Sequence, residues 1–323
     1  MSLQSLGWNA SREQQFTDHR AAGCVPARIA REDRGRYIVL HEDGDSAAEV
    51  TGRFRHEATS RAAYPAVGDW VAVRLAGADA SATIVAVLPR TGVFARKVAG
   101  ETTEEQIVAA NVDAVFVVAG LDGDFNPRRI ERFLAAAWDS GAQPVVVLNK
   151  MDLAEDLDAQ IAEVEASSPG VPVVATSALA GDRVDALAAW LESGTTVALL
   201  GSSGVGKSTL VNALLGAERQ ATGAVREDDS RGRHTTTRRE LVALPSGALL
   251  IDTPGMRELQ LWADESSLES AFPDIEELAR SCRFGDCSRR TGTTAPAPRY
   301  RGTCSRATTR RPRAAARAFP ACR

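Results

Sequence analysis

A short glycine-rich segment has the residue types and the spacing of a phosphate-binding loop. Residues 201–208 read Gly-Ser-Ser-Gly-Val-Gly-Lys-Ser and match the pattern G-x-x-x-x-G-K-S/T in full. Glycine lets such a backbone curl so that its N–H groups face phosphate oxygens, and the N-terminus of a following helix adds positive potential. We expect Lys207 to reach the β- and γ-phosphates and Ser208 to bind Mg²⁺. The predicted loop residues are Gly201, Ser202, Ser203, Gly204, Val205, Gly206, Lys207, Ser208 and Thr209.

A second polar segment, residues 149–152, indicates which base is bound. It reads Asn-Lys-Met-Asp, the N-K-x-D pattern that reads guanine in GTPases. The Asp152 carboxylate can accept hydrogen bonds from the guanine N1–H and exocyclic amine, whereas adenine would leave it unpaired. Lys150 can lie along the base, and Asn149 can tie this loop to the phosphate loop. With the strand-end segment 176–178, the predicted base-binding residues are Asn149, Lys150, Met151, Asp152, Ser177 and Ala178.

A third segment, Asp-Thr-Pro-Gly at residues 252–255, follows an expected buried strand about 50 residues after the phosphate loop. Asp252 is expected on the Mg²⁺ side of the site, and the Gly255 N–H is expected to sense the γ-phosphate. The polar stretch before that strand contains three consecutive threonines at 235–237. One of them, with Thr236 as the candidate, is expected to complete the Mg²⁺ shell.

The residue after Gly255 has a consequence for hydrolysis. Many GTPases place a water-orienting glutamine there, but this chain has Met256. Methionine cannot polarise water, so we expect slow hydrolysis without help. The candidates for that help are His234 and a partner molecule.

Lysine usage supports the first two motifs. The chain has 35 Arg and only three Lys, at positions 97, 150 and 207. Two of the three therefore lie in nucleotide motifs, where a compact ammonium on a flexible stem is not replaceable by a guanidinium fork.

The composition predicts a soluble, multi-domain cytoplasmic protein. The chain has 323 residues, of which 44% are hydrophobic and 25% charged, and no apolar run is long enough to span a bilayer. Residues 1–15 lack the basic start and apolar stretch of a signal peptide. The chain has five cysteines, an odd number, and four of them lie in the last 42 residues. This distribution favours a metal site over a set of disulfide bonds. We expect no membrane association and a monomer.

The elements that must position these motifs fall into two patterns. Residues 26–31, 35–40, 68–73 and 82–88 read as short strands separated by turns, which predicts a small β-barrel of the OB or SH3-like type. From residue 107 onward, apolar strands at 112–119, 144–148, 171–175, 196–200 and 248–251 alternate with helices, which predicts a parallel sheet covered on both faces. Helices are expected at 127–138, with Pro127 at its first position, and at 182–191, with Asp182 as its cap.

The motif order is unusual. In ordinary small GTPases the phosphate loop comes first and N-K-x-D last, whereas here residues 149–152 precede residues 201–208. This order predicts a circular permutation. The segment at 252–255 would then end the nucleotide-binding domain, so an anchoring domain is expected beyond it.

In combination, the barrel, these motifs and Cys-Arg-Phe-Gly-Asp-Cys at 282–287 resemble the RsgA/YjeQ family of circularly permuted GTPases. The resemblance covers about residues 20–288. It implies an RNA-binding OB-fold at 1–98, a permuted GTPase domain at 99–262 and a C-terminal zinc-type region at 263–323. It also implies GTP hydrolysis stimulated by the 30S ribosomal subunit, binding to 16S rRNA and a role in late maturation of that subunit.

The C-terminal region departs from the family pattern C-x4-C-x-H-x5-C. Cys282 and Cys287 have the first spacing, with Cys304 as a candidate third zinc ligand, but Arg289 and Ala295 stand where His and Cys are expected. From residue 289 onward the tail has ten Arg and no Leu, Ile, Val or Met. Two explanations stay open, a shifted reading frame and a genuine basic RNA-binding tail.

Two other functions were weighed against the GTP-hydrolysing assembly factor. One is a GTP-switched RNA-binding protein with negligible hydrolysis, which Met256 keeps open. The other is an ATP-dependent kinase or ATPase, which the guanine-reading residues 149–152 disfavour.

Overall fold

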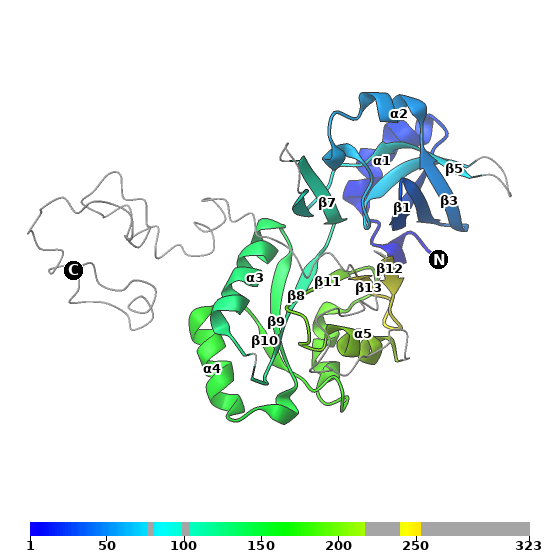
Figure 1. Ribbon diagram of the computed structural model, residues 1–323. Helices are drawn as coiled ribbons and strands as arrows, with labels where there is room; N and C mark the ends of the chain where they lie inside the picture. The colour runs from blue at the N-terminus through cyan, green and yellow to red at the C-terminus, as the bar shows by residue number, and fades with distance from the viewer. Residues whose placement is uncertain (76–80, 99–103, 124, 217–239, 253–323) are drawn as a thin grey trace, which may run out of the picture.

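The computed structural model describes residues 1–75, 81–98, 104–123, 125–216 and 240–252. These residues form a β-barrel in the N-terminal part of the chain and an α/β unit after it (Figure 1). The described helices include none that is long and apolar enough to cross a membrane.

The chain starts with two short helical elements that the sequence did not predict. The 3-10 helix η1 spans Gln4–Leu6, and helix α1 spans Ala10–Ala21 with Asn9 as its N-cap. Between them, Trp8 packs edge-on against Phe16 of α1 and against Trp70 of the barrel, with ring centroids 5.6 and 4.7 Å apart. These aromatic contacts fix α1 to the barrel.

The barrel has five strands and closes on itself. Its strands are β1 (Val25–Asp33), β2 (Arg36–His41), β3 (Gly44–Val50), β4 (Trp70–Arg74) and β5 (Ala82–Val87). They pair in the order β1-β2-β3-β5-β4, with β4 returning to β1 and with β3 parallel to β5. Helix α2 (Gly52–Glu57) and the 3-10 helix η2 (Arg61–Ala63) connect β3 to β4. The predicted small barrel is confirmed as a closed barrel.

A two-stranded ribbon leads from the barrel to the α/β unit. It consists of β6 (Val93–Val98) and β7 (Glu104–Ala110), which pair antiparallel.

The α/β unit has the parallel sheet that the sequence predicted. Its strands are β8 (Ala114–Gly120), β9 (Gln143–Asn149), β10 (Val173–Ala175), β11 (Thr196–Leu200) and β13 (Leu249–Asp252), with β12 (Glu240–Ala243) antiparallel to β13. They lie in the order β10-β9-β8-β11-β13-β12. The other elements are α3 (Pro127–Asp139), η3 (Met151–Leu153), α4 (Leu157–Ser167), η4 (Val184–Trp190) and α5 (Lys207–Leu215).

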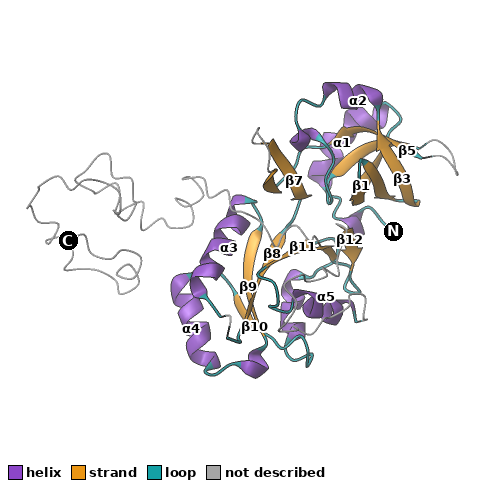
Figure 2. Cartoon of the chain, viewed as in Figure 1, coloured by secondary structure: helices purple, strands orange, loops and turns teal. Residues whose placement is uncertain are grey.

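The helices cover both faces of this sheet (Figure 2). Residues alternate along each strand, so Val115 of β8 faces a core shared with Ile130 of α3, whereas Phe116 faces a core shared with Leu210 of α5. Both faces are therefore buried, which explains why the strands read as continuous apolar runs.

The helix expected after Asp182 is present as the 3-10 helix η4, but its expected cap was wrong. The N-cap is Arg183, in the left-handed conformation (φ 56°), and no side chain caps the helix. Asp182 lies one residue before the cap, where its backbone exchanges two 3.0 Å hydrogen bonds with the backbone of Ser177.

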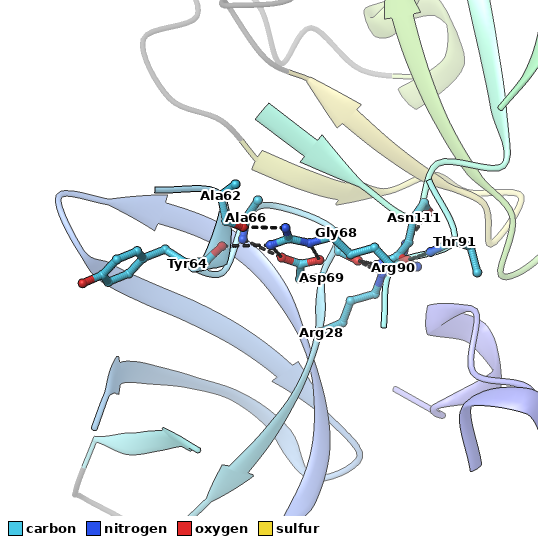
Figure 3. A network of polar contacts seen from close by, with 9 residues as sticks. All are labelled: Arg28, Ala62, Tyr64, Ala66, Gly68, Asp69, Arg90, Thr91 and Asn111. Atoms are coloured by element: carbon cyan, nitrogen blue, oxygen red, sulfur yellow. Dashed lines mark hydrogen bonds and ion pairs between the residues drawn. The ribbon is translucent and has the colours of Figure 1, made fainter. Parts of the chain in front are cut away.

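A buried polar network joins the barrel to the α/β unit (Figure 3). The Arg28 guanidinium, 1% exposed, donates to the carbonyls of Leu6, Gly68 and Asn111 and to Thr196 Oγ1. Burial lowers the pKa of Arg28 to about 10. Because Thr196 begins β11, the strand that leads to the phosphate loop, this network fixes the barrel relative to the nucleotide motifs.

The two parts also share a sheet. Strand β12 pairs with β13 on one side and with barrel strand β1 on the other, where Glu240 lies opposite Arg31. The sheet of the α/β unit therefore continues into the barrel.

Candidate nucleotide-binding site

The predicted motifs meet at one edge of the parallel sheet. Asn149 ends β9, Thr176 follows β10, Gly201 follows β11 and Asp252 ends β13. Because parallel strands present their carboxyl ends at the same edge, this edge is where α/β folds bind ligands.

The phosphate loop depends on glycine at three positions with positive φ. Gly201, Gly204 and Gly206 have φ values of 147°, 84° and 92°. At Gly201 a Cβ would lie 2.2 Å from the Val118 carbonyl oxygen, and at Gly206 it would lie 2.2 Å from Asn149 Nδ2. The loop can therefore approach the neighbouring strand ends only because these side chains are absent.

Lys207 lies across the phosphate loop. Its Nζ donates to the carbonyl oxygens of Gly201 and Ser202, at 2.6 and 2.5 Å. Helix α5 begins at Lys207, with Gly206 as its N-cap, and Ser208 and Thr209 are in its first turn. The first-turn N–H groups and the ammonium therefore form a positively polarised site that suits phosphate.

Asn149 connects the base-reading loops to the phosphate loop. Its side chain is buried; Nδ2 donates to the Val205 carbonyl at 2.9 Å, and Oδ1 accepts from the Ala178 N–H at 2.9 Å. Thr176 Oγ1 also lies 3.4 Å from Asn149 Oδ1. The Asn149 amide thus fixes its own loop, the phosphate loop and the segment after β10 relative to one another.

The two charged residues of the N-K-x-D segment lie in different surroundings. Lys150 has a positive φ of 63° and forms a 2.5 Å ion pair with Asp122 Oδ2. Asp152 is exposed in η3, and the N–H of Met151 beside it donates to the Thr176 carbonyl at 3.0 Å. Asp152 can therefore be reached by a base that approaches from solvent.

The structure adds two residues that the sequence motifs missed. Asp122 contacts Lys150 of the guanine-reading segment, and Arg129 of α3 donates from Nη1 to Ser202 Oγ of the phosphate loop at 3.1 Å. Asp122 follows strand β8, so its place at a carboxyl strand end could have indicated it. Arg129 lies 73 residues before Ser202, and no motif links the two.

Several predicted site residues lie outside the described residues. These are His234, Thr236, Gly255, Cys282, Cys287 and Cys304. For Asp252 the structure gives the backbone position at the end of β13. Within the described part of the chain, no group of three or more His, Cys, Asp or Glu could hold a metal ion.

Known proteins were compared with this chain, and the RsgA GTPase family model matches residues 87–262. The small ribosomal subunit biogenesis GTPase RsgA of Opitutus terrae is 53% identical over 297 residues, covering 89% of this chain and 81% of the relative. The protein of the same name from Syntrophotalea carbinolica is 45% identical over 295 residues, covering 89% of this chain and 80% of the relative.

Solved structures agree with these matches. YjeQ from Thermotoga maritima superposes with a TM-score of 0.62 at 27% identity, covering 82% of this chain and 86% of that one. YloQ, described as a circularly permuted GTPase, gives a TM-score of 0.55 at 26% identity, covering 81% and 82%. The chain therefore shares its fold with solved structures, one of them described as a circularly permuted GTPase, and it belongs to the RsgA GTPase family.

Proposed function

We propose that this chain binds and hydrolyses GTP at the carboxyl edge of its parallel sheet and acts in the biogenesis of the small ribosomal subunit. The observation that carries this proposal is the geometry of Asn149, which holds the guanine-reading segment against the phosphate loop. The relatives named small ribosomal subunit biogenesis GTPase supply the partner.

In this proposal Asp152 accepts hydrogen bonds from guanine, and Lys150, Ser177 and Ala178 line the base. Lys207 leaves the carbonyls of Gly201 and Ser202 for the phosphate oxygens, which are stronger acceptors because they are charged.

Mg²⁺ fits the donors at this edge. Ser208 supplies a hydroxyl oxygen and Asp252 a carboxylate, which are ligands that Mg²⁺ prefers. Strands β11 and β13 are adjacent, with Ala198 opposite Ile251. Asp252 ends β13, and the phosphate loop that leads to Ser208 follows β11. The ion would neutralise phosphate charge, with Thr236 as a further ligand and the Gly255 N–H at the γ-phosphate.

Because Met256 stands where many GTPases have a water-orienting glutamine, the proposal includes stimulation of hydrolysis by a partner. This side chain cannot orient the attacking water, so His234 or a group from the ribosomal subunit does so. The alternative is a GTP-switched RNA-binding protein with negligible hydrolysis. Turnover of GTP with and without purified small subunits decides between them, and unchanged, negligible turnover would support the alternative.

We further propose that the barrel is an OB-fold that contacts 16S rRNA. Of its aromatic residues, Tyr37 and Trp70 are buried at 3% and 1%, so they cannot stack on bases. Phe54 and Tyr64 are partly exposed, with ring centroids 5.9 Å apart, and exposed Arg53 lies beside them on α2. If a Phe54→Ala variant binds small subunits as tightly as wild type does, the surface around Phe54 and Tyr64 is not the rRNA contact.

The protein is proposed to work in the cytoplasm as a monomer. Zinc is not part of the proposed reaction, because Arg289 and Ala295 stand at two ligand positions of the family pattern and an arginine cannot replace a neutral imidazole.

A further inference from the structure

The segment that links β8 to α3 contacts both ends of the candidate nucleotide site. Asp122 near its start reaches Lys150 beside the base-reading loop, and Arg129 near its end reaches Ser202 in the phosphate loop. Neither residue belongs to a nucleotide-binding motif.

The contact at the guanine end is an ion pair between partly buried groups. Lys150 Nζ lies 2.5 Å from Asp122 Oδ2, and the two side chains are 26% and 28% exposed. The position of Asp122 is itself fixed, because Leu121 donates its N–H to the Asn149 carbonyl at 2.8 Å, which binds the start of this segment to the end of β9. The carboxylate therefore fixes the position of the ammonium beside the guanine-reading segment.

The contact at the phosphate end acts on a residue that Lys207 also holds. Arg129 Nη1 donates to Ser202 Oγ at 3.1 Å, and Lys207 Nζ donates to the Ser202 carbonyl at 2.5 Å. Arg129 is in the first turn of α3, whose N-cap Asn126 accepts from the Arg129 N–H at 3.2 Å, so the guanidinium extends from a fixed backbone.

We propose that Asp122 and Arg129 are positioning residues for the nucleotide, with Asp122 orienting Lys150 at the guanine end and Arg129 orienting Ser202 at the phosphate end. This inference rests on the proposed assignment of the GTP site. It predicts that each residue is energetically coupled to its own partner and independent of the other pair.

The guanine end is tested with a double-mutant cycle on GDP binding, using a fluorescent GDP. Asp122→Asn and Lys150→Met are each expected to weaken binding about tenfold, and the double variant by about tenfold rather than a hundredfold. Asp122→Asn should raise KM for GTP and leave the subunit-stimulated kcat near wild type, because base contacts are the same in the ground and transition states.

The phosphate end is tested with Arg129→Met, Ser202→Ala and their double variant. Each single variant is expected to weaken GDP binding about tenfold, and the double variant by about tenfold as well. Arg129→Met should also lower kcat, since the loop that contains Ser202 positions Lys207 at the transferred phosphoryl group. Arg129→Lys should recover part of both losses. Arg128→Ala is the matched control, because Arg128 is the exposed neighbour on the same helix and should leave both quantities unchanged.

Four outcomes would contradict the inference or the assignment on which it rests. Losses that multiply within a pair, or single variants that bind like wild type while their Tm is also unchanged, overturn the proposal. Coupling across the pairs, between Asp122→Asn and Arg129→Met, overturns the independence of the two ends. If Lys207→Ala binds GDP as wild type does, the assignment of the GTP site fails instead.

Discussion

The side chain of Asn149 touches the phosphate loop and the segment after β10, so the distance between base and phosphate contacts is set before any nucleotide arrives. This arrangement leaves no room for a side chain at position 206, because a Cβ added to Gly206 would lie 2.2 Å from Asn149 Nδ2. Preset geometry of this kind lowers the entropy cost of binding.

Gly206→Ala should therefore abolish nucleotide binding. The new methyl group would meet Asn149, and the backbone φ of 92° is unfavourable for alanine. Gly216→Ala is the matched control, because Gly216 also has a positive φ of 65° but nothing lies within 4 Å of its Cβ position. Titration with a fluorescent GDP measures both, and equal affinities for the two variants would contradict the steric account.

Asp152→Asn should shift the base preference from guanine to xanthine. The asparagine amide can donate to the xanthine carbonyl, where the carboxylate only accepts. Competition between GTP and xanthosine triphosphate reports the change. Asp152 is not the base reader if the preference for guanine stays the same.

The nucleotide motifs and the strands that present them could be predicted because each follows from local residue types. Gly201, Lys207 and Asn149 occur in fixed spacings at the ends of apolar strands. The contacts of Asp122 and Arg129 could not be predicted, because their partners lie 28 and 73 residues away, although the place of Asp122 at a strand end could have marked it as a candidate. Only the folded chain brings these pairs together.

At the level of elements, the sequence pattern predicted most of the apolar strands, whereas elements with few apolar residues were missed. Strand β3 (Gly44–Val50) was missed because its exposed positions are polar and it starts at a glycine that reads as a turn. Helix α1 was missed because it buries only Arg12 and Phe16, which is too few for an apolar stripe. The helix expected after Asp182 forms as a 3-10 helix, but Asp182 does not cap it, since the N-cap position is at Arg183.

The connection between barrel and ribbon depends on one buried ion pair. Asp69 accepts from Arg90 Nη2 at 2.7 Å, and these side chains are 0% and 17% exposed. Arg90 also donates to the carbonyls of Ala62 and Tyr64, so it holds the end of the α2–β4 connection (Figure 3). Burial raises the pKa of Asp69, and Arg90 opposes that rise.

Asp69→Ala should destabilise the protein by about 3–5 kcal/mol, because it leaves the Arg90 charge buried without its partner. Arg53→Ala is the control, since it breaks the 2.7 Å pair with Glu57, in which both side chains are exposed, and should leave the free energy of unfolding nearly unchanged. Urea unfolding measures both. Similar losses of unfolding free energy in the two variants would show that burial does not make the Asp69–Arg90 pair more stabilising than an exposed pair.

At the scale of the whole molecule, the barrel and the nucleotide unit form one continuous sheet. Strand β12 lies between barrel strand β1 and β13, and β13 ends at Asp252. The strand that ends at Asp252 is thus separated from the barrel by one strand, β12.

The C-terminal region is expected to bind less than one zinc per chain. Residues 289–323 contain 30 Arg, Ala, Thr, Pro or Gly residues out of 35, and the His and Cys of the family pattern are absent at 289 and 295. We predict that another reading frame of the gene after Ser288 encodes a His-x5-Cys segment. Zinc analysis of the purified chain and translation of the other frames check this, and one zinc per chain or no such segment would contradict it.

The central claim is that a permuted GTP site hydrolyses its nucleotide when the small ribosomal subunit is present. The most direct test is GTP turnover by wild type and Lys207→Ala, each with and without purified subunits, with thermal unfolding as the check on folding. We expect the subunits to stimulate wild type strongly, and Lys207→Ala to stay folded and inactive in both conditions because no ammonium offsets the phosphate charge. Full stimulated turnover by Lys207→Ala, or a wild type that subunits do not stimulate, would contradict the account.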